Sequence, residues 1–204
     1  ASAADGGDAV RITRTPAVES QLNWAPDSRR LVYSSNRDGA WHIYSYDFAM
    51  NEESQLTSGS LNDVSPQFSP DGRMAAFLRD ARELRVVDLA TKQERALAQG
   101  VFDRAPFQSQ RPLAWSPDSR WIAYLSGGTK VFMNACLVPL DGGTGRQATF
   151  LSNTRAGTLS WSPDGAYLLL DSGMRTAPGG LARVDLLPRV PKFREDQFRD
   201  LFRE

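Results

Sequence analysis

The chain has 204 residues, of which 41% are hydrophobic and 24% are charged, values typical of a folded globular protein. Lys and Arg together number 24, and Asp and Glu also number 24, so the formal net charge is zero. This balance excludes the basic surface expected of a nucleic-acid-binding protein or of a protein held on an anionic membrane. No apolar run approaches the length that a membrane-spanning helix needs.

Residues 9–13 are the first predicted strand. They resemble the ends of later units at 55–57 and 147–149. We therefore interpret residues 9–19 as the closing strand of a repeated unit whose other strands are not in the preceding sequence.

A ten-residue motif then occurs four times: an aromatic residue, a Ser or Ala, the pair Pro-Asp, a Ser or Gly, and a short apolar run. The prolines are 44, 47 and 46 residues apart, a period typical of propeller blades. Proline presets φ at the second position of a tight turn, Asp suits the third, and Gly or Ser closes it. We expect the aromatic residue to be buried between neighbouring blades. The motif residues that we interpret as structural are Trp24, Pro26, Asp27, Phe68, Pro70, Asp71, Trp115, Pro117, Asp118, Trp161, Pro163 and Asp164.

The four copies divide the chain into units of about 20–62, 63–106, 107–155 and 156–190, and we predict one propeller region over 1–190. The motif contributes the first two strands of each unit, and two more strands follow. The predicted strands are 22–24, 30–34, 41–46 and 54–57 in unit one; 64–68, 74–78, 84–89 and 95–98 in unit two; 112–115, 121–125, 131–138 and 147–150 in unit three; and 158–161, 167–170 and 181–187 in unit four.

An Asp recurs near the end of the third strand, at Asp47, Asp88 and Asp185, and unit three has Asp141 slightly later. We interpret these side chains as acceptors for the amides of the following turns. The alternative is a ring of cation ligands, which would require the carboxylates to converge.

Cysteine and histidine each occur once. Because Cys136 is the single cysteine, no intramolecular disulfide can form. It lies in the largely apolar run 131–140, and we interpret it as a small buried hydrophobic side chain. His42 stands beside Trp41 in a strand pattern, with no cysteine or second histidine near it. A metal site or a histidine-based triad therefore has no support, and we predict no cofactor and no metal.

The end of the chain departs from the repeat. Unit four has no obvious fourth strand, because Pro188 and Pro191 cannot donate to a strand ladder. Residues 191–204 place Phe198, Leu201 and Phe202 on one helical face. We predict a linker or a docking helix there, and a helix this short needs a surface to lie on.

The motif resembles the repeat shared by TolB, the tricorn protease propellers and the prolyl-oligopeptidase-type propellers. It differs from the WD repeat, since neither Gly-His nor Trp-Asp occurs at blade spacing. Residues 21–30, 181–186 and 191–202 are most similar to large bacterial tricorn-type serine peptidases. The resemblance implies an all-β fold of four recognisable four-stranded antiparallel blades, part of a larger propeller, in the periplasm or cell envelope.

The resemblance carries no catalytic residue to this chain, since the family's catalytic serine, its base and its PDZ domain have no counterpart here. Patterns for a nucleophile elbow or a phosphate-binding loop are also missing from the sequence. The leading hypothesis is a non-catalytic module for protein or peptide interaction, admitting substrates to a tricorn-type peptidase; whether the parent protein is an enzyme stays open. The alternatives are a TolB-like periplasmic scaffold that binds envelope proteins and a free-standing enzyme.

Closure of the ring is a separate question. The blades of larger relatives are not wedge-shaped enough to close at four, so the terminal units would expose strand edges and apolar faces. One solution is internal, with 9–13 pairing with 181–187. We favour a partner instead, either missing parent domains or a second copy of the chain, in addition to a peptide or protein ligand. Nucleic acid and membrane insertion are not expected.

Overall fold

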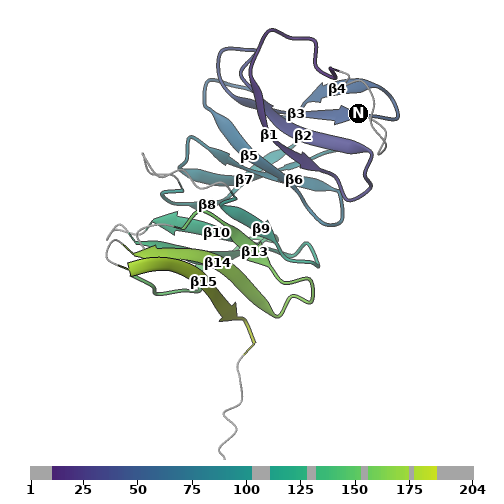
Figure 1. Cartoon of the computed structure of the whole chain (residues 1–204). Helices are drawn as coiled ribbons and strands as arrows, with labels where there is room; N and C mark the ends of the chain where they lie inside the picture. Colours follow the sequence, from purple (N-terminus) through teal and green to yellow (C-terminus); the bar gives the residue numbers. More distant parts are fainter. Residues whose placement is uncertain (1–10, 103–110, 128–131, 153–155, 175–176, 188–204) are drawn as a thin grey trace, which may run out of the picture.

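The computed structural model describes residues 11–102, 111–127, 132–152, 156–174 and 177–187 (Figure 1). Within these ranges the chain forms four antiparallel sheets and no helix, and so no helix that could cross a membrane. Figure 1 shows the sheets following one another in chain order from the top of the molecule to the bottom. The predicted blades are confirmed, whereas the predicted helix at 191–204 lies outside the described residues.

Blades one to three each have four strands, paired in the order in which the chain forms them, and the described part of blade four has three. Blade one contains β1 (Glu19–Trp24), β2 (Arg30–Ser35), β3 (His42–Asp47) and β4 (Glu52–Gln55). Blade two contains β5 (Asp63–Phe68), β6 (Met74–Arg79), β7 (Glu83–Asp88) and β8 (Glu94–Gln99). Blade three contains β9 (Leu113–Trp115), β10 (Trp121–Gly127), β11 (Met133–Pro139) and β12 (Arg146–Gln147). Blade four contains β13 (Leu159–Trp161), β14 (Tyr167–Met174) and β15 (Ala177–Asp185).

The repeated motif forms the same turn in every blade. The carbonyl of its Ser or Ala accepts a hydrogen bond from the amide three residues later, at 2.9–3.0 Å. Proline therefore occupies the second turn position and Asp the third, as predicted. The residue that closes the turn has a positive φ of 57–74°, a conformation that glycine adopts without strain. These closing residues are Ser28, Gly72, Ser119 and Gly165.

The aspartate holds each turn from inside. In blade three, Oδ1 of Asp118 accepts hydrogen bonds from the Ser116 hydroxyl at 2.6 Å and from the Arg120 amide at 3.1 Å. The Ser116 hydroxyl oxygen accepts the amide of Trp121, the first residue of β10, at 2.9 Å. The amide two residues after the aspartate is bound in the same way by Asp27, Asp71 and Asp164. The turn is thus fixed by local bonds, whatever lies beside the blade.

Three buried hydrophobic clusters join the blades in series. Among the described residues, no such cluster joins blade four to blade one. The largest buried side chains are Ile43 and Phe77 between blades one and two, Phe102 and Ile122 between blades two and three, and Leu125 and Leu168 between blades three and four.

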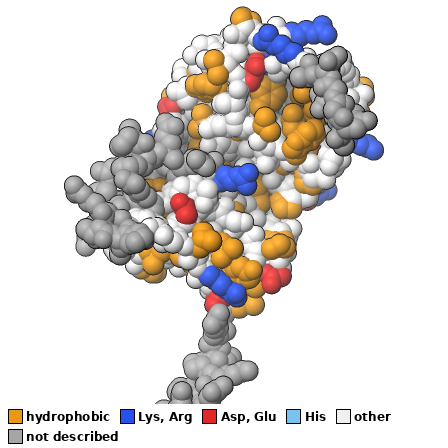
Figure 2. All heavy atoms as spheres, in the orientation of Figure 1, with side chains coloured by type: hydrophobic (Ala, Val, Ile, Leu, Met, Phe, Trp, Pro, Cys, Tyr) orange, Lys and Arg blue, Asp and Glu red, His pale blue; other side chains and the backbone are white. Residues whose placement is uncertain are grey.

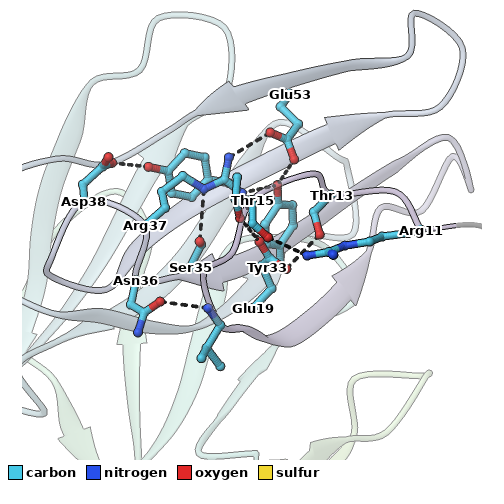
Figure 3. A network of polar contacts seen from close by, with 12 residues as sticks. Arg11, Thr13, Thr15, Glu19, Tyr33, Ser35, Asn36, Arg37, Asp38 and Glu53 are labelled. Carbon is cyan, nitrogen blue, oxygen red and sulfur yellow. Dashed lines mark hydrogen bonds and ion pairs between the residues drawn. The ribbon is translucent and has the colours of Figure 1, made fainter.

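The prediction of a closing strand at 9–13 is not supported where it can be tested. Residues 11–13 are not in a strand, and residues 9 and 10 lie outside the described part of the chain. Ile12 packs against a cluster formed by Tyr33, Tyr44 and Tyr46, on the outer face of blade one. The Thr13 hydroxyl donates to a Glu19 carboxylate oxygen at 2.8 Å (Figure 3). Side-chain contacts with blade one, rather than a strand ladder, position this segment, and β15 pairs with β14.

The prediction that every motif aromatic residue is buried was wrong for blade one. Phe68 and Trp115 are buried, with 6% and 7% of their surface exposed, and Trp161 is half-buried, but Trp24 is 52% exposed. Trp24 stacks on Phe48 of its own blade, with ring centroids 5.2 Å apart. Its exposure follows from its position, because no blade of the described chain covers that face.

Candidate binding groove

A groove of about 380 Å³ runs along the innermost strands of all four blades. The strands β1 and β5, β5 and β9, and β9 and β13 pack beside one another, so their inner surfaces form one continuous lining. Much of that lining is polar. The polar side chains are Gln21, Asn23, Ser65, Gln67, Arg111 and Ser160.

Two of these residues lie at bulges with an unusual backbone. Gln21 in β1 and Ser65 in β5 have φ values of 56° and 57°, where the strand register shifts. The Gln21 side-chain oxygen accepts the Ser65 amide at 2.8 Å, and the Asn23 side-chain oxygen accepts the Phe68 amide at 2.9 Å. Blade one therefore supplies the acceptors for amides of blade two. Within the described chain, no hydrogen bond uses the side-chain nitrogen of Gln21 or Asn23, so each keeps two donors.

Arg111 places a positive charge at the groove. Its main chain is fixed against blade four, since its amide donates to the Gly157 carbonyl and its carbonyl accepts the Leu159 amide, both at 3.0 Å. Its side chain is exposed and forms no ion pair with a carboxylate in the described ranges. The groove thus offers amide donors and one guanidinium, which are suited to the carbonyl and carboxylate oxygens of a ligand.

The sequence analysis missed this groove. Of the motif residues that it named, Trp115 and Trp161 line the groove, whereas the prolines and aspartates lie on the turns, one turn per blade. In blades one, two and four, polar residues one and three positions before the aromatic residue carry the signal that could have revealed it. Gln21, Asn23 and Gln67 are such residues, in strands otherwise expected to be apolar.

The aspartates at the ends of the third strands do not form a cation site. Oδ1 of Asp47 accepts the amides of Ala49 and Met50, and Oδ1 of Asp88 accepts those of Ala90 and Thr91. The hydrogen bond from the Thr91 amide is the largest cause of the lowered pKa of Asp88. This agrees with the predicted turn role. Asp185 instead accepts the Arg183 guanidinium at 2.8 Å, and the described residues contain no group of three potential metal ligands.

Neither reactive side chain singled out in the sequence lies in a catalytic arrangement. Cys136 is half-buried in β11, and burial raises the pKa of its thiol, which disfavours the nucleophilic thiolate. His42 is buried in β3, and its Nδ1 has no hydrogen-bond partner. Neither lines the groove.

A polar network of blade one is shown in Figure 3, and none of the residues labelled there lines the groove. Arg37 donates to Glu53 at 2.8 Å and lies 4.1 Å from the centre of the Tyr44 ring. Tyr33 donates to the same carboxylate at 2.8 Å. Burial, together with the nearby Asp38 carboxylate, raises the pKa of Tyr44 to about 12. Its phenol is therefore protonated at neutral pH and acts as a hydrogen-bond donor.

Comparison with known proteins now places the chain. The family model described as the TolB beta propeller domain matches residues 2–163. The chain belongs to the TolB beta propeller family. This TolB-type propeller is related to the propellers of peptidases.

Two relatives and one solved structure illustrate the range of proteins that are similar to this chain. The propeller is 41% identical over 54 residues to a TolB homolog of Protochlamydia amoebophila, covering 26% of this chain and 12% of that protein. It is 27% identical over 122 residues to dipeptidyl-peptidase 5 of Porphyromonas gingivalis, covering 52% of this chain and 17% of that protein. The crystal structure of TolB from Acinetobacter baumannii superposes with a TM-score of 0.67 at 20% identity, over 85% of this chain and 42% of that one.

Proposed function

We propose that this propeller is a non-catalytic module that holds an extended peptide segment, and that it admits substrates to a peptidase of the tricorn type. The observation that carries the proposal is the groove along all four inner strands, with the amide donors of Gln21 and Asn23 and the guanidinium of Arg111. Its volume of about 380 Å³ falls within the range of ligand sites.

A peptide main chain matches these groups. Its carbonyl oxygens would accept from the amide nitrogens of Gln21 and Asn23, and a carbonyl or the terminal carboxylate would accept from Arg111. Since the contacts reach the peptide backbone, this chemistry favours holding many sequences over selecting one. The relationship to dipeptidyl-peptidase 5, of which the chain covers 17%, supports a setting beside a peptidase.

The second candidate is a TolB-like scaffold that binds proteins of the cell envelope. The observation that favours it is the outer face of blade one, where Leu22 and Trp24 are more than half exposed and no other blade of the described chain covers Trp24. The likeness to TolB proteins supports this alternative and a location in the envelope.

Peptide binding by the purified chain tests the proposal. Arg111→Gln should weaken the binding of short peptides about tenfold, since a charged hydrogen bond is lost. Arg146→Gln removes the same charge from the outermost strand of blade three and should leave the affinity unchanged. Equal effects of the two substitutions would contradict the groove. Cleavage of the peptides, blocked by a serine-directed inhibitor, would contradict the non-catalytic role, and binding of folded envelope proteins without peptides would favour the scaffold.

A further inference from the structure

A second cavity, of about 450 Å³, lies between the motif turns of blades three and four. Its walls are largely apolar, and the carboxylates of Asp118 and Asp164 also line it. Figure 2 shows hydrophobic side chains beside charged ones in the lower part of the molecule, where Figure 1 places blades three and four. The apolar side chains that line it include Trp121, Leu137, Trp161, Leu186 and Leu187.

The equivalent position between blades one and two is filled by the chain itself. Arg30, six residues after the motif aromatic Trp24, extends toward blade two. Its guanidinium lies 5.7 Å from the centre of the Phe68 ring and donates to the Gly72 carbonyl at 3.3 Å. It also pairs with Asp27 of its own turn at 3.0 Å. An aromatic ring, a glycine carbonyl and a motif aspartate therefore surround one arginine side chain.

Blades three and four repeat this environment without the cation. By motif position, Trp161 stands where Phe68 does, Gly165 where Gly72 does, and Asp118 where Asp27 does. The position of Arg30 is occupied by Trp121, an uncharged side chain that lines the cavity. The cavity keeps the groups that surround a guanidinium between blades one and two, but none of the described residues that line it supplies a guanidinium.

A difference in the turns explains why this gap stays open. Between blades two and three, the Ser119 hydroxyl accepts the Asp71 amide at 3.0 Å and ties the two turns together. The corresponding residue in blade four is Gly165, which has no hydroxyl. A Cβ atom there would lie 4.0 Å from Pro117 Cδ and from Trp161 Nε1, an ordinary contact distance. Serine has φ values of 57° and 58° at this motif position in blades one and three, so the backbone accommodates it.

The charge of the cavity favours a cation. Hydrogen bonds from the Ser116 and Ser162 hydroxyls lower the pKa of Asp118 and of Asp164, so both carboxylates are ionised at neutral pH. Among the described residues, two basic side chains are near. Arg120 is exposed on the turn of blade three, while Arg183 binds Asp185 and lies 3.9 Å from the centre of the Tyr167 ring. Neither lines the cavity.

We propose that this cavity binds the side chain of an arginine in a peptide, with the guanidinium against the Trp161 indole and beside Asp118. Trp161 also lines the groove along the inner strands, so a peptide in the groove can extend an arginine into the cavity. In that respect the inference rests on the proposed peptide-binding function. Planar guanidinium groups stack on indole rings and pair with carboxylates, which suits arginine better than lysine.

The test compares two short peptides that differ only in one central residue, arginine or its neutral isostere citrulline. By titration calorimetry, the arginine peptide should bind about tenfold more tightly to the wild-type chain. Asp118→Asn should remove this preference and leave the affinity for the citrulline peptide unchanged. Asp71→Asn alters the same turn position of blade two and should keep the preference. Gly165→Ser, which restores the hydroxyl found in blade three, should reduce it.

The outcomes separate the two proposals. Equal affinity for both peptides, weakened alike by Arg111→Gln, would overturn the arginine site and leave the groove in place. An arginine preference that survives Asp118→Asn would also overturn it. Binding of free arginine as tight as that of the peptide would show that the cavity acts without the groove, against the peptide-bound occupant. No binding of either peptide would overturn both proposals.

Discussion

The interface between blades two and three and the outer face of blade one present the same motif aromatic in opposite settings. At the interface, Trp115 is buried in a hydrophobic cluster, and its indole nitrogen donates to the Gln67 carbonyl of the neighbouring blade at 3.2 Å. On the outer face, Trp24 is more than half exposed and stacks only within its own blade. Figure 2 shows hydrophobic side chains on the upper part of the molecule, where Figure 1 places blade one.

The motif turn is the same in blades one and three, with the same carbonyl-to-amide bond and a closing serine at φ 57–58°. The difference therefore lies in the neighbour and not in the turn. A local motif encodes its own geometry, whereas the burial of its aromatic residue depends on whether another blade covers it.

The two tryptophans should differ most when they are truncated. Trp115→Ala should cost about 3–5 kcal/mol of unfolding free energy, because a buried aromatic side chain and its hydrogen bond are lost. Trp24→Ala should cost about 1 kcal/mol or less, and the half-buried Trp161 should give an intermediate value. Urea unfolding measures all three. Equal urea midpoints for the Trp115 and Trp24 variants would show that the two tryptophans contribute equally to stability, against this contrast.

A buried carboxylate of blade two and a partly exposed carboxylate of blade one give a smaller contrast. In blade two, Asp63 is fully buried and accepts the Arg79 guanidinium through both oxygens, at 2.7 and 2.9 Å. Asp63→Asn would remove the fully buried carboxylate and leave Arg79 paired with Glu94 alone, at 2.8 Å, and should cost roughly 3 kcal/mol of unfolding free energy. On the face of blade one, Glu53→Gln should cost below about 1 kcal/mol, because solvent screens this partly exposed carboxylate. Similar losses in the two variants, measured by urea unfolding, would contradict the contrast.

The smallest expected difference between a variant and its control concerns self-association through the outer face of blade one. Leu22 is 66% exposed there and lines a small cavity beside Tyr46. If a second copy of the chain covers this face, Leu22→Asp should weaken association about tenfold, or 1.4 kcal/mol, in sedimentation equilibrium. Leu61→Asp, at another exposed leucine, is the control. A wild-type chain that stays monomeric at all concentrations and binds little hydrophobic dye would refute the association.

Much of the fold could be predicted because the motif repeats its own local chemistry. Pro, Asp and a closing Ser or Gly specify the turn through bonds within a few residues, so the four blades could be predicted from the sequence. The exposure of the Trp24 side chain could not be predicted from the motif, because it depends on whether a neighbouring blade covers it. The groove was also missed, because Gln21 and Asn23 act across blades, on amides more than 40 residues away.

The serial arrangement of the three hydrophobic clusters has a consequence for how the chain opens. In a linear array, each unit is stabilised by its own strands and by its nearest neighbours only. Of the three clusters that join blades in the described chain, blades two and three take part in two each and blades one and four in one each. The inner pair should therefore form the slowest-exchanging amide core, with protection from hydrogen exchange falling toward both ends of the arc. Docking a further blade against either end would convert a fraying terminus into an interior unit and raise its protection without changing any of its own bonds.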